Sequence, residues 1–195
     1  MHPRIFREFD RICRSYGAGG AVLEIGAVAG PDSLLCLDAL DCASEKVGVN
    51  LSPPSRFRDF EILQASANRL DIFDPCSFDT ILCNATLEHD PFFWKTLEEV
   101  RRVGRPGALV VIGVPGYASH PWLERFKRRR IAVTGRWLWG ALRASTPTLV
   151  VHDYPGDYYR FSEQAVREVF FSGMCDVIVR RLMVPPRIIG AGRLL

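Results

Sequence analysis

AVLEIGAVAGPDS, residues 21–33, has the form of a strand followed by a nucleotide-binding loop. The apolar run contains one acid, Glu24, and Gly26 and Gly30 come after it. Glycines at such a turn permit positive φ and let a phosphate or a nucleoside approach the main chain. Val28 stands where a third small residue would complete the loop, and its β-branched side chain resists positive φ. The stretch therefore predicts a strand, a tight turn, and a loop that is either widened or weakened at Val28.

The composition is that of one globular domain. With 195 residues, the chain is long enough to bury a continuous core without disulfides or metals. Hydrophobic residues make up 48% and charged residues 24%, which excludes a disordered chain and a coiled coil. The net charge of +3 is too small to indicate a nucleic-acid partner. We expect a single domain over residues 1–195.

Cysteine usage and hydropathy indicate a soluble, cytoplasmic protein. The six cysteines form no CxxC pair and mostly fall inside apolar runs, which favours reduced, buried thiols. Their spacing shows no zinc site, and we expect no metal. No apolar run approaches the roughly 18 residues of a membrane span, and residues 1–13 lack the apolar core of a secretory signal.

Short apolar runs alternate with helical patterns along the first two thirds of the chain. Most of these runs lack in/out alternation, as is typical of parallel strands covered on both faces. The predicted strands are 21–25, 46–50, 60–65, 78–84 and 108–114. Helices are predicted at 31–42, which begins with a proline, and within 90–107. In the second, Asp90 can cap, Pro91 fits the first turn and Gly104 ends the helix.

The C-terminal part predicts a last helix and a hairpin. Residues 161–173 form a helical pattern in which Ser162 can cap and Gly173 can end the helix. Two short terminal strands, 175–184 and 187–195, follow. Together these elements predict an α/β fold with a doubly wound, mainly parallel seven-stranded sheet and a terminal β-hairpin.

Five segments in register resemble the class I methyltransferases that use S-adenosylmethionine, and within them the small type 11 group. The segments are VLEIG with Gly30, GVNLSPPS (48–55), SFDTILCNATLEH (77–89), RVGRPGALVVIGVPG (102–116) and DYYRFSEQAVREVFFSGM (157–174). The resemblance covers about residues 15–195. It implies a Rossmann-like methyltransferase fold, S-adenosylmethionine as the cofactor, and methyl transfer as the reaction.

The resemblance also implies which residues contact the cofactor. These candidates are Glu24 (near the ammonium group), Gly26, Gly30, Asn50 (at the ribose hydroxyls), Ser66 (near the adenine) and Asn84. Asn50 and Ser66 stand where the family usually has acids. Both can still accept a hydrogen bond, but a charged acceptor binds more strongly, so each replacement costs about 1 kcal/mol.

Three interpretations of the loop stay open at this point. The first is a working methyltransferase. The second is an interaction module of the same fold whose cofactor site has eroded at Val28, Asn50 and Ser66. The third, a dinucleotide oxidoreductase, fits less well, because the glycine spacing is G-x-x-x-G, Pro31 lacks a backbone donor, and no acid ends the second strand. Each candidate residue also has a purely structural interpretation as a turn or strand-end residue.

His89 is the candidate catalytic base. It follows the strand-four segment, at the sheet edge where ligands bind in open α/β folds. An imidazole is suited to removing a proton from an acceptor, although His89 could instead only support the start of the next helix. Asn84 is not followed by the proline and aromatic residue of the amine- and base-methylating branches. The sequence therefore favours oxygen or carbon acceptors, such as a sugar, a glycolipid precursor or a secondary metabolite.

The residues between 152 and 160 are the densest polar and aromatic group in the chain. In the enzymes that the chain resembles, this segment borders the acceptor pocket. His152, Tyr158 and Arg160 are therefore candidate substrate-binding residues. The alternative is a turn in which Arg160 only forms an ion pair.

A basic, tryptophan-rich insertion is expected at about 117–150. Within it, residues 120–143 hold seven Arg or Lys against one Glu, and three tryptophans. A solvated helix pair, a lid that binds an acidic or phosphorylated acceptor, and a peripheral membrane contact are all compatible with this composition. No nucleic-acid recognition module is present in it.

Overall fold

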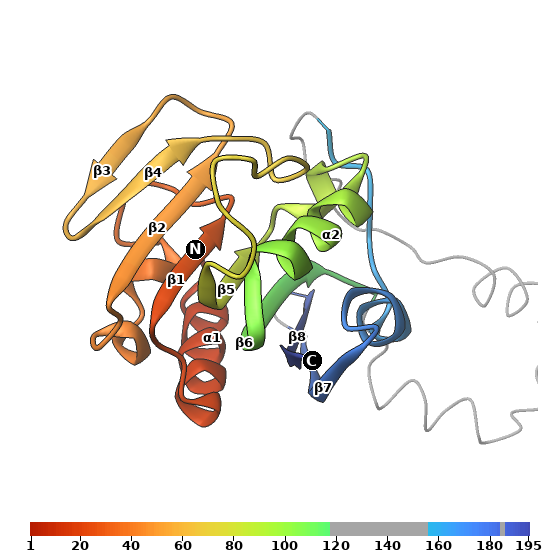
Figure 1. Ribbon diagram of the computed structural model, residues 1–195. Coiled ribbons are helices and arrows are strands. Elements are labelled where there is room, and N and C mark those ends of the chain that lie inside the picture. Colours follow the sequence, from red (N-terminus) through yellow and green to blue (C-terminus); the bar gives the residue numbers. More distant parts are fainter. Residues whose placement is uncertain (118–155, 184–185) are drawn as a thin grey trace, which may run out of the picture.

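The computed structural model describes residues 1–117, 156–183 and 186–195 (Figure 1). Its centre is one sheet in the order β3-β4-β2-β1-β5-β6-β8-β7. The strands are β1 (Ala21–Ile25), β2 (Glu45–Asn50), β3 (Ser55–Phe57), β4 (Phe60–Gln64), β5 (Phe78–Asn84), β6 (Gly104–Pro115), β7 (Met174–Met183) and β8 (Pro186–Leu194). The α-helices are α1 (Pro3–Tyr16), α2 (Phe93–Val103) and α5 (Glu163–Ala165). Short helical turns are η1 (Leu34–Cys36), η2 (Asp38–Leu40), η3 (Leu87–His89) and the π-turn η4 (Val166–Phe170).

The strand pairing confirms the mainly parallel sheet with a terminal hairpin. β1 pairs in parallel with β2 and β5, and the parallel pairing continues to β4 on one side and β6 on the other. β8 runs antiparallel to β6, and β7 antiparallel to β8. The described residues contain one strand more than the expected seven. The extra strand, β3, is a three-residue edge strand antiparallel to β4, joined to it by a turn in which Arg58 has a φ of 52°.

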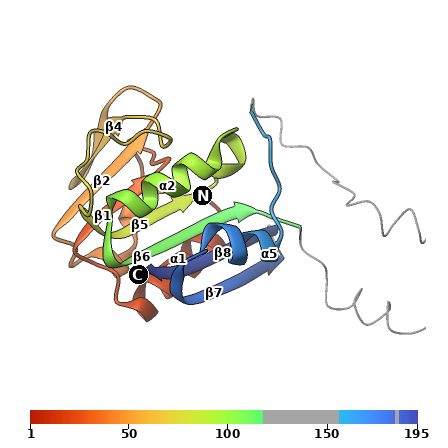
Figure 2. The same ribbon diagram turned by 45° about the vertical axis from the view of Figure 1, so that its right-hand side comes forward.

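Helices cover both faces of the sheet, which is the doubly wound arrangement (Figure 2). On one face, Phe9 and Ile12 of α1 pack with Val22 of β1. On the other, Leu97 and Val100 of α2 pack with alternate residues of the same strand, together with Phe170 of η4. The central strands are therefore buried on both sides, as their continuous apolar runs predicted.

The prediction of a helix at 31–42 is wrong, because the segment forms two short 3-10 turns, η1 and η2. Leu37 lies between them in an extended conformation, with ψ of 133°. This break lets four leucines bury completely against one face of the sheet: Leu34, Leu35, Leu37 and Leu40. A single α-helix would spread these side chains over a wider arc, so burial decides against it.

Among the other helices, α1 was not predicted from the sequence, and the N-cap residue of α2 is Phe92 and not the expected Asp90. α2 ends before Gly104, as expected, but it starts at Phe93, and Asp90 accepts a hydrogen bond from the Phe92 amide at 2.8 Å. The Ser162 hydroxyl accepts a hydrogen bond from the Ala165 amide at 3.0 Å, which confirms it as a cap. The π-turn η4 then continues the helix from α5 to Phe170.

Most of the insertion expected at about 117–150 lies outside the described residues. Residues 120–143 and His152 also lie outside the described residues. No helix in the described part is long and apolar enough to cross a bilayer. In that same part, no group of three or more His, Cys, Asp or Glu side chains is placed to hold a metal ion. All six cysteines are free thiols, but the expectation of buried thiols is wrong for most of them, because only Cys13 and Cys83 are buried.

Candidate cofactor and acceptor site

The carboxyl ends of the parallel strands meet at one edge of the sheet, and most of the predicted site residues follow these ends. Gly26 follows β1, Asn50 ends β2, Ser66 comes just after β4, and Asn84 ends β5. The chain order also reverses between β1 and β5, because β2 lies on the other side of β1. Ligands in open α/β sheets bind at such a switch point, so the fold gathers these residues at the expected place.

Gly26 makes a turn that a side chain would block. Its φ is +79°, and its amide donates to the Val49 carbonyl at 2.9 Å. A Cβ on Gly26 would lie 2.0 Å from the Thr86 hydroxyl oxygen. That hydroxyl is itself within 3.3 Å of the carbonyls of Ile25 and Asn84, so it joins the ends of β1 and β5. Glycine is therefore required at position 26 for two reasons: the positive φ, and the close approach of the Thr86 hydroxyl that bridges β1 and β5.

The loop accommodates Val28 without strain. The side chain is 50% exposed, and the residue is not among those with positive φ. Two residues later, a Cβ built on Gly30 would meet no atom within 4 Å. The Val28 side chain is therefore half-exposed, and the loop keeps open space at Gly30.

Glu24 lies beneath the loop as a buried carboxylate, 4% exposed. It accepts hydrogen bonds from the Ser33 hydroxyl, from the Leu34 amide at 3.1 Å and from the Leu35 amide at 3.3 Å. Burial raises its pKa to about 7, although these three hydrogen bonds act in the opposite direction. The carboxyl group thus joins β1 to the start of η1 and fixes the far end of the loop.

Asn50 and Ser66 form hydrogen bonds to the nearby main chain. The Asn50 amide group donates to the Ala27 carbonyl at 2.7 Å, which connects the end of β2 to the loop after β1. Its side-chain oxygen accepts from the Ser52 amide at 3.2 Å. The Ser66 hydroxyl accepts from the Asn68 amide at 3.3 Å. Both residues therefore shape the turns that carry them.

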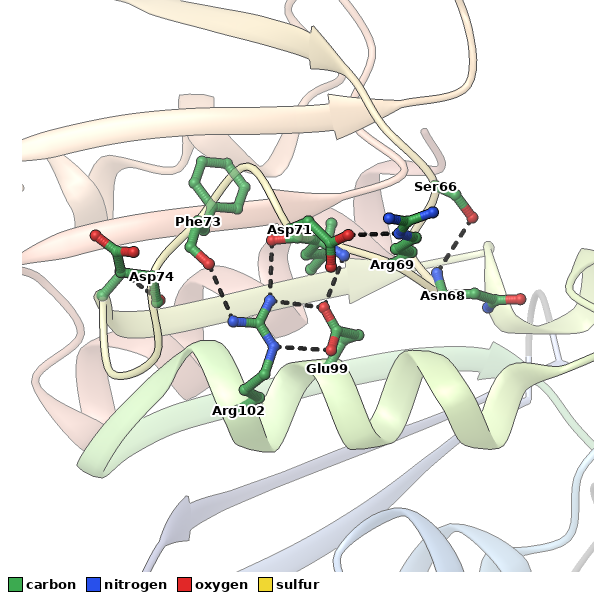
Figure 3. A network of polar contacts seen from close by, with 10 residues as sticks. Ser66, Asn68, Arg69, Asp71, Phe73, Asp74, Glu99 and Arg102 are labelled. Atoms are coloured by element: carbon green, nitrogen blue, oxygen red, sulfur yellow. Dashed lines mark hydrogen bonds and ion pairs between the residues drawn. The ribbon is translucent and has the colours of Figure 1, made fainter.

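The loop after β4 is fastened to α2 by a polar network (Figure 3). The Arg102 guanidinium donates to the carbonyls of Leu70 and Phe73 at 2.9 and 3.0 Å, and it pairs with Glu99. Glu99 in turn accepts from the Leu70 amide at 2.6 Å, and its contact with Arg102 lowers its pKa. The position of Ser66 at the edge of the site thus depends on an anchor that lies on α2.

The exit of β5 takes a path that proline cannot take. Ala85 has a φ of 57°, and its amide donates to the Gly113 carbonyl at 2.9 Å. Proline fixes φ near −65° and has no amide hydrogen, so it fits neither requirement. The side-chain oxygen of Asn84, the residue before it, is buried and has no hydrogen-bond partner.

His89 and the segment 156–161 lie together at the same exit. The His89 Nδ1 atom is 3.3 Å from the Gly156 carbonyl oxygen. The amides of Tyr158 and Tyr159 donate to the Glu88 carbonyl at 2.8 and 3.2 Å. This segment, which follows the insertion in sequence, is therefore bound through its main chain to the turn η3.

The two described substrate-binding candidates differ in exposure. Tyr158 is 58% exposed beside η3. Arg160 forms a two-pronged ion pair with Asp157, and this pairing raises the pKa of the guanidinium. The pair matches the structural alternative considered for Arg160. The structure thus brings His89 and Tyr158 to one place, while Arg160 has a partner within its own turn.

Three further residues of the site were not predicted from the sequence: Thr86, Glu88 and Arg187. Thr86 joins β1 and β5, as described above. Glu88 is buried, and the Arg187 guanidinium at the start of β8 contacts it at 3.2 Å. No local signal in the sequence marks Glu88 as buried, because its partner is 99 residues away.

Two surface hollows lie at the opposite edge of the sheet. One is bordered by Gly19, Asp79 and Arg193, and the other by Cys76 and Leu195. Neither includes a predicted site residue. In the described part of the chain, the site is therefore defined by strand ends and side-chain chemistry.

The family profile described as "Methyltransferase domain" matches residues 17–112. The match confirms the resemblance and includes all of the cofactor candidates and His89. No curated protein sequence matches the chain significantly.

Solved structures share the fold at low sequence identity. A 1,6-didemethyltoxoflavin-N1-methyltransferase from Burkholderia thailandensis, crystallised with S-adenosylhomocysteine, is 16% identical; the similarity covers 97% of this chain and 77% of that one, with a TM-score of 0.65. A SAM-dependent methyltransferase from Archaeoglobus fulgidus is 13% identical over 97% and 93% of the two chains, with a TM-score of 0.64. A phosphoethanolamine N-methyltransferase 2 from Haemonchus contortus, in complex with S-adenosylmethionine, is 14% identical over 96% and 52%, with a TM-score of 0.59.

Proposed function

We propose that this chain, whose residues 17–112 match the methyltransferase-domain family, binds S-adenosylmethionine and transfers its methyl group to a small molecule. The observation that carries the proposal is the loop between Gly26 and Gly30, which is held open at the switch point between β1 and β5. When bound there, the cofactor supplies an already activated methyl group on a sulfonium. The protein then has to align an acceptor and, for a hydroxyl or amine, take up a proton.

The described residues fit such a ligand. Open space at Gly30 admits a group close to the main chain, and the half-exposed Val28 side chain leaves that space free. The Asn50 side-chain oxygen, held by Ser52, stands at the end of β2 where it can accept a further bond from a ribose hydroxyl. Glu24, already bonded to three groups of the chain, serves the site by fixing the loop.

A Gly30→Ala substitution tests this placement. Because no protein atom lies within 4 Å of the added Cβ, the free energy of unfolding should stay within about 0.5 kcal/mol of the wild type. The methyl group would instead occupy the space proposed for the cofactor, so calorimetry should show S-adenosylhomocysteine binding weakened tenfold or more. Unchanged affinity would mean that the ligand does not approach Gly30.

The competing functions are separated by ligand-dependent stabilisation of the wild type. S-Adenosylmethionine or S-adenosylhomocysteine at 100 times its dissociation constant should stabilise the fold by about 2.7 kcal/mol. NAD should have no effect, because the glycine spacing is G-x-x-x-G and Pro31 lacks an amide donor for a pyrophosphate. An eroded interaction module would respond to none of the three ligands.

We assign the proton-accepting role to His89. A neutral imidazole that donates from Nδ1 to the Gly156 carbonyl has its basic nitrogen at Nε2, so this contact supports the tautomer that a base needs. The position of His89 at the exit of β5, beside the segment 156–161, supports a role on the acceptor side of the site.

Two His89 variants separate catalysis from structure. His89→Asn keeps an amide donor near the position of Nδ1 but has no basic nitrogen, whereas His89→Ala loses both. If His89 is the base, both variants should lower kcat by about 100-fold with little change in cofactor affinity. Turnover would be followed with labelled S-adenosylmethionine, on the acceptor found by screening small molecules for methylation. Recovery of activity in His89→Asn alone would assign His89 a structural role.

The acceptor class is proposed as a sugar, a glycolipid precursor or a secondary metabolite. The β5 exit supports an oxygen or carbon acceptor, because the φ of Ala85 is incompatible with the proline of the amine- and base-methylating branches. Two of the structural neighbours are named as N-methyltransferases, so this preference rests on the β5 exit alone. The further proposal of an acidic or phosphorylated acceptor, and of a peripheral membrane contact, rests on the basic residues of 120–143.

A further inference from the structure

Glu88 holds a carboxylate oxygen that the protein does not use. The side chain is buried, and its Oε1 atom contacts the Arg187 guanidinium at 3.2 Å. Its Oε2 atom is also buried, yet it has no hydrogen-bond partner. Buried polar atoms in native proteins are nearly always bonded, so an open oxygen in this position calls for a ligand or an internal water.

A second open oxygen lies on the same face of the sheet. Asn84 is paired in register with Gly113, and a Cβ on Gly113 would lie 2.7 Å from the Asn84 side-chain oxygen and 2.9 Å from the Phe9 ring of α1. Arg187 is paired with Pro115, two residues along β6 from Gly113, so its side chain leaves the sheet on this same face. Glu88 reaches Arg187 and therefore lies on the α1 side as well. In the described part of the chain, Asn84 and Glu88 carry the only buried side-chain atoms without a partner.

Both open atoms are acceptors, and this determines the chemistry of what can bind them. A carboxylate or amide oxygen offers lone pairs and can be satisfied only by an N–H or O–H donor. Among the described residues, Arg187 pairs with Oε1 of the Glu88 carboxylate, while the charge of Arg160, which is paired with Asp157, also acts on Glu88. An anion placed at Oε2 would meet a second negative group, whereas an amine or hydroxyl would supply the missing donor.

We propose that Glu88 Oε2, together with the Asn84 side-chain oxygen, binds an amine or hydroxyl donor on the methyl acceptor. The proposal rests on the function proposed above and specifies the group that the acceptor presents at the exit of β5. Glu88 is then a specificity-determining residue, and Arg187 holds its carboxylate in place.

The segment 156–161 lies beside Glu88 at the exit of β5. It contacts the turn η3 through main-chain hydrogen bonds from Tyr158 and Tyr159 to the Glu88 carbonyl, and not through the carboxylate. Tyr158 is 58% exposed, whereas Tyr159 packs against Phe93 of α2 and donates from its hydroxyl to the Pro91 carbonyl at 3.1 Å.

The test uses three small probes of different chemistry on the full-length protein: ethanolamine, ethylene glycol and acetate. Each is titrated with and without S-adenosylhomocysteine and followed by the amide NMR signals of residues 84–89. We expect ethanolamine or ethylene glycol to bind at this site and acetate not to bind. Glu88→Gln should weaken that binding tenfold or more and leave S-adenosylhomocysteine affinity unchanged. Glu98→Gln removes the same charge from an exposed position on α2 and should bind the probes as the wild type does.

The outcomes separate this inference from the proposed function. Failure of S-adenosylhomocysteine to bind contradicts the proposed function alone, because the probes are also tested without it. If neither donor probe shifts these signals, or if a crystal soaked in both donor probes shows only an internal water on Oε2, the inference is wrong and the cofactor proposal stands. Should Glu88→Gln fail to fold, that soaked wild-type crystal decides, since the inference requires the probe's donor atom within hydrogen-bonding distance of Oε2.

Discussion

Gly26→Ala should destabilise the protein by roughly 3 kcal/mol or more and abolish measurable binding of S-adenosylhomocysteine. Two costs add at this position. A left-handed backbone at φ +79° is unfavourable for any residue with a Cβ, and the new Cβ would lie 2.0 Å from the Thr86 hydroxyl oxygen. Relief of the second cost requires Thr86 to leave the carbonyls of Ile25 and Asn84 that it joins. Chemical denaturation and calorimetry measure the two effects.

A double-mutant cycle of Gly26→Ala with Thr86→Ala measures the steric part of the destabilisation. Thr86→Ala removes the hydroxyl and the methyl group, which would lie 2.0 and 3.1 Å from the added Cβ, so Gly26→Ala should cost less in that background. Gly30→Ala is the matched control in the same loop, because its Cβ meets nothing and its φ is not left-handed. Equal stability losses for Gly26→Ala and Gly30→Ala would contradict the account of the turn.

The strands were predictable because burial on both faces leaves a strong local signal. Residues 78–84 and 21–25 were predicted with the limits that β5 and β1 have in the structure. Such runs cannot be solvent-exposed, and they are too short for helices, so the sheet is the one arrangement that buries them. The edge strand β3 lacks this signal, because Ser55–Arg56 are exposed and the strand is held by pairing with β4.

The leucine-rich segment after the loop shows where local patterns fail. Its leucines fit a helix about as well as two 3-10 turns when only the sequence is considered. Burial of all four leucines against the sheet decides for the two turns, and Glu24 fixes the start of η1 by accepting hydrogen bonds from the Leu34 and Leu35 amides. Tertiary packing of this kind overrides helix propensity, and it has no signature within the segment itself.

The candidate site also contains residues that could be predicted from the sequence and residues that could not. Gly26, Asn50, Asn84 and His89 could be placed because each follows a recognisable strand, and strand ends meet at one edge. Glu88 and Arg187 could not, because their contact joins η3 to β8 and depends on the register of the C-terminal hairpin. Asn50 was expected to face the ribose, and the structure adds a bond to the Ala27 carbonyl that no spacing rule would reveal.

The stability that Glu24 contributes should fall as the pH rises from about 4.5 to about 7. Burial raises its pKa in the folded state to about 7, while the unfolded chain keeps the ordinary value of 4.5. Between these values the folded protein holds a proton that the unfolded chain has released, so each increase in pH favours unfolding. The full effect is at most roughly 3 kcal/mol, reached above pH 7, where the buried group is ionised in both states.

Thermal unfolding tests the direction of this pH dependence. It is measured from pH 5 to pH 8 for the wild type, Glu24→Gln and Glu99→Gln. Glutamine stays neutral but cannot satisfy all three donors, so Glu24→Gln should be the less stable protein at pH 5, and its deficit should shrink towards pH 8. Arg102 lowers the pKa of Glu99, so the stabilisation due to Glu99 is present above pH 4.5 and is lost only as the pH falls through its lowered value. The deficit of Glu99→Gln should therefore stay constant over the same range. A Glu24→Gln deficit that grows with pH would show that the bonds from Ser33, Leu34 and Leu35 outweigh burial, and that the loop is held by a permanently ionised carboxylate.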